Sequence, residues 1–329
     1  MFLVTLIVVC TLAFDFINGF HDTANAIATV VSTRVLSPRT AILMAAGLNF
    51  LGALCFTKVA ATVAKGLVVG ATPHVILAAI LGAIVWNLAT WYFGIPSSSS
   101  HALIGGLIGA AWVAGGRQTI LWKGVVDKVI LPLVMSPLAG FIIGFAVMAL
   151  IVLVFANAQA AKTGRIFRGL QVVSSAVMSF AHGTNDAQKS MGIITMALAT
   201  RDLHPSETPP VLLWVKVACA VAMAAGTSLG GWRIIKTMGH KIIRLEPVSG
   251  FAAETTASLV ILYATLTGKT VSTTHVISGS IFGVGSAKRF SAVRWSVAQT
   301  MLIAWTLTIP ASAAVAALCY LGIRRLGVN

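Results

Sequence analysis

Two short segments of this sequence match each other, and each places a carboxylate directly after an apolar run. The first is residues 19–26, GFHDTANA, and the second is residues 183–190, GTNDAQKS. Asp22 and Asp186 fall at the matched position of the two copies. A carboxylate at membrane depth costs about 2.5–3.5 kcal/mol by insertion scales, so a duplicated one needs a chemical reason. Binding of a proton, of a cation or of a hydrogen-bond donor would supply it.

A second pair of segments carries hydroxyl groups. Residues 98–105, SSSHALIG, correspond to residues 272–279, STTHVISG. In each segment the Ser/Thr cluster precedes a short apolar helix in which glycines recur. Hydroxyl clusters cap helix N-termini, and the positive end of a helix attracts phosphate or sulfate. A plain cap would explain either cluster alone, but the duplication beside the Asp motifs favours anion binding. The hydroxyl candidates are Ser98, Ser99, Ser100, Ser272, Thr273 and Thr274.

Further groups could carry a coupling proton or cation. His21 and Asn185 stand next to the two Asp residues, and Glu254 lies inside an apolar span. Histidine titrates near neutral pH and can relay protons. We expect Gly19 and Gly183 to let their helices unwind, which would free backbone groups for ions at the centre of the membrane.

The elements that carry these motifs are membrane spans. Hydrophobic residues make up 57% of the chain and charged residues 9%, with a mean hydropathy of +0.93. Several apolar runs can cross a hydrocarbon layer of about 30 Å. The net charge of +15 comes from Lys and Arg in the short connections, so the sequence predicts a lipid bilayer as partner and no nucleic acid. The four cysteines lie in apolar runs without the spacing of a disulfide or zinc site.

The repeated motifs divide the chain into two similar halves. We predict a first transmembrane repeat over residues 1–156, a cytoplasmic linker over 157–169 and a second repeat over 170–329. Each half contains an odd number of hydrophobic passages, which inverts the second copy. The predicted fold is an all-α integral membrane protein with two inverted-topology repeats and about ten to twelve transmembrane or re-entrant helices, broken at the midplane. The excess of basic residues in alternate connections places both termini outside the cytoplasm.

With these four motifs in the same order, the sequence resembles the inorganic phosphate transporter family over essentially its whole length. The resemblance implies symport of inorganic phosphate with sodium or protons, in the inner (plasma) membrane, as a multi-pass protein without a cofactor. It leaves a homo-oligomer open. It also implies which residues surround the substrate and the coupling ion, namely Asp22, Asn25, Asp186, Ser99, Ser100, Thr273 and Thr274.

Two departures from the sodium-coupled branch concern the coupling ion. Lys189 stands where the first repeat has Asn25, and Asn49 stands where sodium-coupled relatives commonly carry Glu. The segment through Gln188 and Lys189 is similar to bacterial low-affinity phosphate transporters, which implies proton coupling and phosphate carried with a divalent metal. We therefore add Gln188 and Lys189 to the predicted phosphate site. Sodium coupling stays the alternative, and no resident metal is assigned.

Three other functions compete with phosphate symport. Sulfate would also suit helix N-termini, but at neutral pH only phosphate can donate a hydrogen bond to Asp22 or Asp186. A membrane-embedded enzyme would not need an inverted duplicate of its site, and the sequence contains no HExxH or nucleophile-elbow motif. A passive channel would not need helix breaks that occlude the pathway. The sequence therefore predicts a secondary transporter and not an enzyme.

Overall fold

The computed structural model describes residues 2–65, 67–202 and 210–326, and its regular structure is helical. The helices of the first half are α1 (Phe2–Ser32), α2 (Pro38–Cys55), α3 (Lys58–Lys65), α4 (Pro73–Phe93), α5 (Ser99–Gly115), α6 (Trp122–Val125) and α7 (Leu131–Val154). Those of the second half are α8 (Ala160–Asp202), α9 (Leu213–Leu229), α10 (Trp232–Lys236), α11 (Pro247–Leu266), α12 (Thr273–Lys288) and α13 (Trp295–Arg325). Two 3₁₀ turns and two π turns connect them, at Arg117–Thr119, Phe290–Ala292, Val126–Ile130 and Thr237–Lys241.

Local sequence explains where several spans begin and end. Ser37 and Thr72 cap α2 and α4 with their hydroxyls, and a proline follows each cap at the first helical position. Gly94 ends α4 in the left-handed conformation, which glycine adopts without a steric penalty. Six described helices or continuous helical segments are long and apolar enough to cross a membrane, and the bent pair of α9 and α10 would make a seventh. The prediction of an all-α membrane protein is confirmed.

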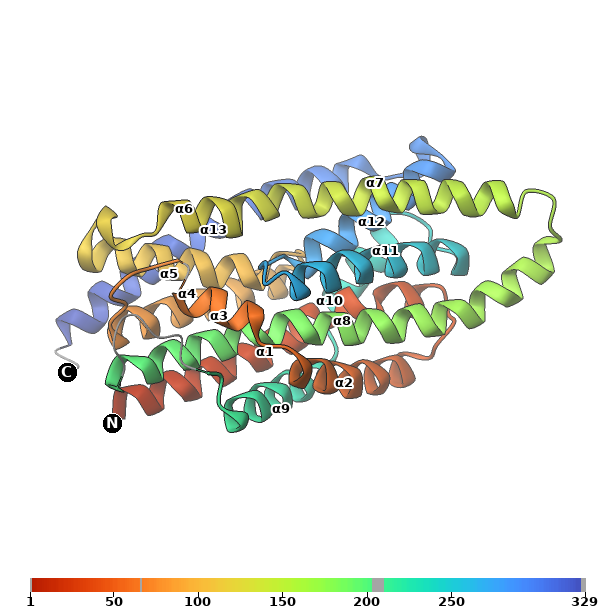
Figure 1. The fold of residues 1–329 in the computed structure, drawn as a ribbon. Helices are drawn as coiled ribbons and strands as arrows, with labels where there is room; N and C mark the ends of the chain where they lie inside the picture. The colour runs from red at the N-terminus through yellow and green to blue at the C-terminus, as the bar shows by residue number, and fades with distance from the viewer. Residues whose placement is uncertain (1, 66, 203–209, 327–329) are drawn as a thin grey trace.

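The two halves enter the bundle from opposite ends. In Figure 1 the start of α1 and the end of α13 lie at one end, whereas the turn between α7 and α8 lies at the other. The long helices α1 and α8 consequently run in opposite directions. This is the relation expected when each half crosses the membrane an odd number of times. Residues 160–169 of the predicted linker form the first turns of α8.

Helix contacts also recur in pairs across the halves. Helix α1 packs on α9 and α8 packs on α2, while α5 packs on α13 and α12 on α7. Each half therefore completes its core with helices of the other half. Apolar clusters fill the space between them, including one around Ile27 and Ile277 and another around Ile7 and Ile80.

A matched pair of polar contacts fastens the ends of α4 and α11. Lys58 Nζ donates to the carbonyl of Leu266 at 3.1 Å, and Arg233 donates to the carbonyl of Tyr92. Cations suit the C-terminal carbonyls of a helix because these carry partial negative charge. Since α4 and α11 directly precede the loops into α5 and α12, these contacts help to position the two hydroxyl clusters.

The expectation that Gly19 and Gly183 unwind their helices is wrong. Both α1 and α8 continue without interruption through these residues. A Cβ at Gly19 would meet the backbone of Met223 and Thr227, and one at Gly183 would meet the backbone of Asn49. Glycine is required here because two helix backbones approach closely, as at the small-residue interfaces of membrane helices.

The helix breaks lie instead in front of the hydroxyl clusters. Helices α5 and α12 contain 17 and 16 residues, so each is about 25 Å long and shorter than the hydrocarbon layer. Both begin inside the bundle, at Ser99 and Thr273, after extended loop residues. Their N-termini thus open toward the middle of the protein.

Candidate functional site

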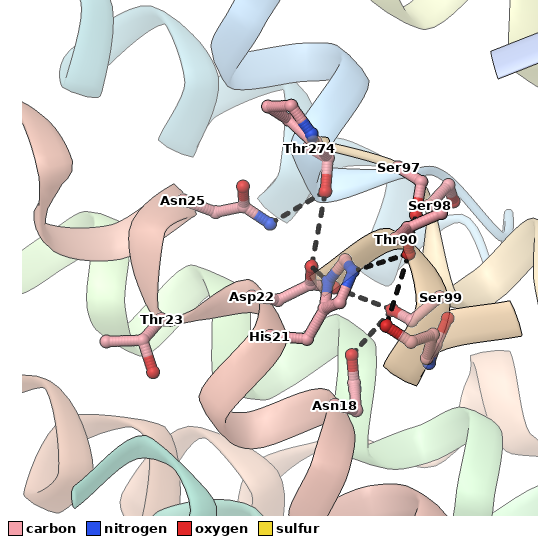
Figure 2. Close-up of polar contacts among 12 residues, drawn as sticks. Asn18, His21, Asp22, Thr23, Asn25, Thr90, Ser97, Ser98, Ser99 and Thr274 are labelled. Atoms are coloured by element: carbon pink, nitrogen blue, oxygen red, sulfur yellow. Dashed lines mark hydrogen bonds and ion pairs between the residues drawn. The ribbon is translucent and has the colours of Figure 1, made fainter. Parts of the chain in front are cut away.

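The first half of the site is centred on Asp22 of α1. Ser99, the first residue of α5, donates to one carboxylate oxygen at 2.6 Å, and His21 Nδ1 lies 2.8 Å from the other. Thr274 of α12 also reaches that second oxygen at 3.4 Å. Figure 2 shows Asp22 between these side chains, with Asn18 as a second acceptor beside the Ser99 hydroxyl. The carboxylate therefore receives donors from both halves of the protein.

The second half of the site is centred on Asp186 of α8. Thr273, the first residue of α12, donates to Asp186 at 2.8 Å, just as Ser99 does to Asp22. His182 Nε2 lies 3.0 Å from the same carboxylate, and Lys189 forms an ion pair with its other oxygen. Both Asp residues are buried, with exposed fractions of 2% for Asp22 and 1% for Asp186.

Two further hydrogen bonds cross between the halves. Asn25 of α1 donates to Thr274 of α12 at 2.9 Å, and Lys189 of α8 donates to Ser100 of α5. Asn25 and Lys189 hold matched positions of the repeated motifs, as do Thr274 and Ser100. The bonding pattern therefore follows the duplication, and only the chemistry of one donor differs.

The N-termini of α5 and α12 contribute positive potential to this centre. Ser98 and Ser272 are the N-caps, and their hydroxyls accept hydrogen bonds from the backbone N–H groups of His101 and His275. The preceding first-turn N–H groups have no acceptor within their own helix. Together with Ser99 and Thr273 they offer donors that suit an oxyanion. Ser98 and Ser272 act as caps, which is the alternative that the sequence left open for each cluster.

Formal charge at the centre is unbalanced when histidines are neutral. Two carboxylates, Asp22 and Asp186, face one ammonium, that of Lys189, which is 3% exposed. An anion cannot join two buried carboxylates unless positive charge accompanies it. The site can therefore hold an oxyanion only together with protons or a cation.

His182 joins the site although the sequence analysis did not select it. Ligand atoms of Asp22, His182 and Asp186 all lie within 4.8 Å of one another, which is close enough for one divalent cation. The signal was its place four residues before Asp186, where one helical turn brings both side chains to the same face. His182 Nδ1 also lies 3.1 Å from Asn49 Oδ1, so the site extends to α2.

Comparison with known proteins agrees with this geometry. A model described as the phosphate transporter family matches residues 18–316. A relative from Bacillus subtilis (strain 168), named "Probable low-affinity inorganic phosphate transporter", is 53% identical over 97% of this chain and 97% of its own length. The chain belongs to the phosphate transporter family. A relative of the same name from Rhizobium meliloti (strain 1021) is 49% identical over 95% of this chain and 94% of its own.

A solved structure also shares the fold of this phosphate transporter family member. It is titled "The sodium-dependent phosphate transporter" and aligns with a TM-score of 0.89, covering 98% of this chain and 99% of that one at 24% identity. Because the family consists of transporters, the predictions of a multi-pass membrane protein and of a non-enzyme are confirmed.

Three predicted site residues of this phosphate transporter family member have other partners. Gln188 accepts hydrogen bonds from the backbone N–H groups of Val59 and Ala60, at 2.9 and 3.3 Å, and so caps the start of α3. Asn185 donates to Thr265 of α11 at 3.1 Å, and its counterpart His21 lies 3.1 Å from Thr90 of α4 through Nε2. Gln188 and Asn185 therefore lie outside the central network, whereas His21 links that network to α4.

Glu254 lies in a separate polar cluster. Its carboxylate accepts hydrogen bonds from Thr29 of α1 and Ser174 of α8, and Gln171 lies 3.5 Å away. Thr29 is seven residues beyond Asp22 on α1, which corresponds to about 10 Å along the helix. Glu254 is thus buried and polar but distant from the two Asp residues.

His101 and His275 meet where the two half-helices begin. Their ring centroids lie 5.0 Å apart, and His275 stacks on Trp305 of α13 at 4.0 Å. The two histidines therefore pack across the interface between the halves, close to the hydroxyl clusters that they follow in sequence.

Proposed function

We propose that this chain is a secondary active symporter that moves inorganic phosphate across the inner membrane with protons, by alternating access. The observation that carries the proposal is the meeting of Asp22 and Asp186 with the N-termini of α5 and α12. In this proposal phosphate binds between the two half-helices and contacts Ser99, Ser100, Thr273 and Thr274, while the inverted halves open the site to each side in turn.

The charge of the site supports coupling to a cation. Phosphate brings negative charge toward two carboxylates that one ammonium cannot balance. Protonation of Asp22 or Asp186, or of the phosphate itself, relieves this repulsion and creates hydrogen-bond donors at the same time. Sulfate at neutral pH gains less from this arrangement because it has no proton to donate to a carboxylate.

Lys189 supports protons over sodium. Its ammonium bonds to Asp186, to the carbonyl of Val271 and to Ser100 of the first half, so three oxygen atoms already surround a positive charge at this position. A sodium ion would compete with this fixed charge for the same oxygens. The first half keeps Asn25, whose side-chain oxygen has no partner among the described residues.

Transport of phosphate with a divalent metal is compatible with the same centre. Two carboxylates and one imidazole, from Asp22, Asp186 and His182, form a donor set that suits such cations, with phosphate oxygens completing the shell. Here the metal is part of the substrate. Lys189 pairs with the Asp186 oxygen that does not face His182, so the other oxygen of that carboxylate can bind a metal while the ion pair stays in place.

Transport in proteoliposomes tests the proposal. Counterflow of labelled phosphate identifies the substrate, and separately imposed pH and sodium gradients identify the coupling ion. We expect accumulation to follow an inward proton gradient and to change little with sodium. Stimulation by divalent cations that is lost in His182→Gln would support a metal–phosphate substrate. Sodium-driven accumulation without a response to the pH gradient would overturn the proton assignment while leaving phosphate transport in place.

A further inference from the structure

Asp15 is a buried acid that the phosphate site does not use. It lies on α1 with an exposed fraction of 0%, and neither carboxylate oxygen has a hydrogen-bond partner among the residues that the structure describes. The hydroxyl of Ser190 on α8 and the thiol of Cys219 on α9 adjoin it. The Ser190 hydroxyl likewise has no partner within the described chain.

The position of Asp15 separates it from the substrate. Asp15 is seven residues before Asp22, so it lies on the same face of α1 but about 10 Å nearer the end where that helix begins. Glu254, which contacts Thr29, lies on the other side of Asp22 along the same helix. Two buried acids thus flank Asp22 in opposite directions along α1.

An ionised Asp15 would be poorly compensated. The charged or titratable groups that face it are Asp186 and Lys189 from α8 and Cys219 from α9. The Lys189 ammonium bonds to Asp186, and no cation of the described chain pairs with Asp15. Because a buried and unpaired carboxylate costs several kcal/mol, the neutral acid is the favoured form in this conformation. A neutral carboxyl carries an O–H donor, and the adjoining Ser190 hydroxyl oxygen is an acceptor of the right kind for it.

The second half of the protein shows that packing does not require an acid here. The repeat aligns Asp15 with Ser179 of α8, whose hydroxyl donates to the carbonyl of Ser175 at 2.8 Å within its own helix. The counterpart is therefore a small, satisfied side chain. Only the first half has a carboxyl at this position, whereas the second half packs with a neutral residue there.

We propose that Asp15 holds a coupling proton at a site separate from phosphate, beside the Ser190 hydroxyl. The inference rests on the proposed proton symport. The proton is bound while the site is closed, as in this structure, and is released when the change in access brings water to the carboxyl. Asp15 would then titrate once in each transport cycle without touching the substrate.

The first test uses Asp15→Asn, which imitates the protonated acid but cannot release a proton. In a pH gradient of about one unit, each coupled proton supports an approximately tenfold higher accumulation ratio. Asp15→Asn should lower pH-driven accumulation by about this factor and retain counterflow, which needs no net proton movement. Ser179→Ala, at the matched position, and Asp127→Asn, at an exposed acid, should leave both measurements unchanged.

Two results of this test would overturn the proposal. One is accumulation by Asp15→Asn that equals the unmodified protein, and the other is loss of counterflow in a folded variant, which would place Asp15 in the substrate pathway or the scaffold. Failure of the unmodified protein to respond to a pH gradient would instead refute the proposed function.

Infrared spectroscopy of the purified protein supplies a measurement that does not depend on transport. A protonated carboxyl has a carbonyl stretch that is distinct from that of a carboxylate, and Asp15→Asn should remove one such component. A second variant, Asp15→Glu, keeps the acid and should shift this component instead of removing it. This variant keeps the test decisive if Asp15→Asn folds poorly. An unchanged band in both variants would show that Asp15 is ionised in the closed state and would end the proposal.

Discussion

Lys189 forms an ion pair with Asp186 inside the protein, at the position that the first half fills with the neutral amide of Asn25. Both side chains also donate to a hydroxyl of the opposite half, Lys189 to Ser100 and Asn25 to Thr274. The two halves are therefore alike in bonding and different in charge. This difference in charge makes the halves of the site inequivalent toward a coupling cation.

Neutralising either central carboxylate should abolish phosphate accumulation. Asp22→Asn and Asp186→Asn each remove a charge on which the donors of a half-helix converge. Labelled phosphate uptake, normalised to protein in the membrane, measures the effect. Asp127→Asn is the control because that side chain is exposed and outside the network. Normal accumulation by either central variant would contradict a shared site.

In each hydroxyl cluster, the first helical residue and the N-cap residue before it should have different roles: the first should bind substrate and the second should stabilise the helix. Ser99→Ala combined with Thr273→Ala removes hydrogen bonds to charged groups, each worth about 1.5–3 kcal/mol. We expect the KM for phosphate to rise about tenfold or more, since 1.4 kcal/mol corresponds to a factor of ten.

The matched control for this pair is Ser98→Ala combined with Ser272→Ala. These residues cap α5 and α12, and loss of each cap should cost about 1 kcal/mol of stability. Lower thermal stability with an almost unchanged KM is expected. If both pairs changed KM equally, the division between caps and substrate ligands would be wrong.

Replacing Lys189 should change the response to ions. Lys189→Asn restores the first-half residue and removes the ammonium that holds Asp186 and Ser100. We expect slower proton-driven uptake and the appearance of weak stimulation by sodium, measured in proteoliposomes with each gradient imposed alone. Lys189→Arg keeps the charge and should show no sodium response. Sodium stimulation of equal size in both variants would argue against a cation-like role for Lys189.

The contact of Arg233 with the end of α4 should tolerate lysine. Its guanidinium lies over Trp91 and Tyr92, with 5.4 and 4.8 Å from Cζ to the ring centroids, and donates to the Tyr92 carbonyl. Arg233→Ala should lower stability by about 1 kcal/mol, the scale of an exposed cation–π contact. Arg233→Lys should retain most of it, because Lys58 makes the matched contact in the other half. Thermal unfolding in detergent compares the two variants.

The membrane fold and the central residues could be predicted from sequence because both depend on patterns within short, contiguous segments. Apolar runs reveal spans, and a carboxylate that recurs at the matched position of a repeat is improbable without a shared role. Asp22, Asp186 and the hydroxyls of α5 and α12 do meet in the structure. The breaks before these hydroxyls were also visible, because the two passages are short.

Roles that depend on a neighbouring helix were decided only by tertiary structure. The same glycine can unwind a helix or admit a backbone, and only the approach of Met223 to Gly19 shows which applies. Gln188 belongs to a motif but turns toward the N-terminus of α3. Glu254 and Asp15 are acids in apolar helices alike, yet one is surrounded by donors and the other is not. The sequence by itself determined which polar groups lie in membrane-spanning helices. Their partners were decided only by the packing of helices from the two inverted halves against each other. The physical reason is that the role of a buried polar group depends on the contacts that replace its water.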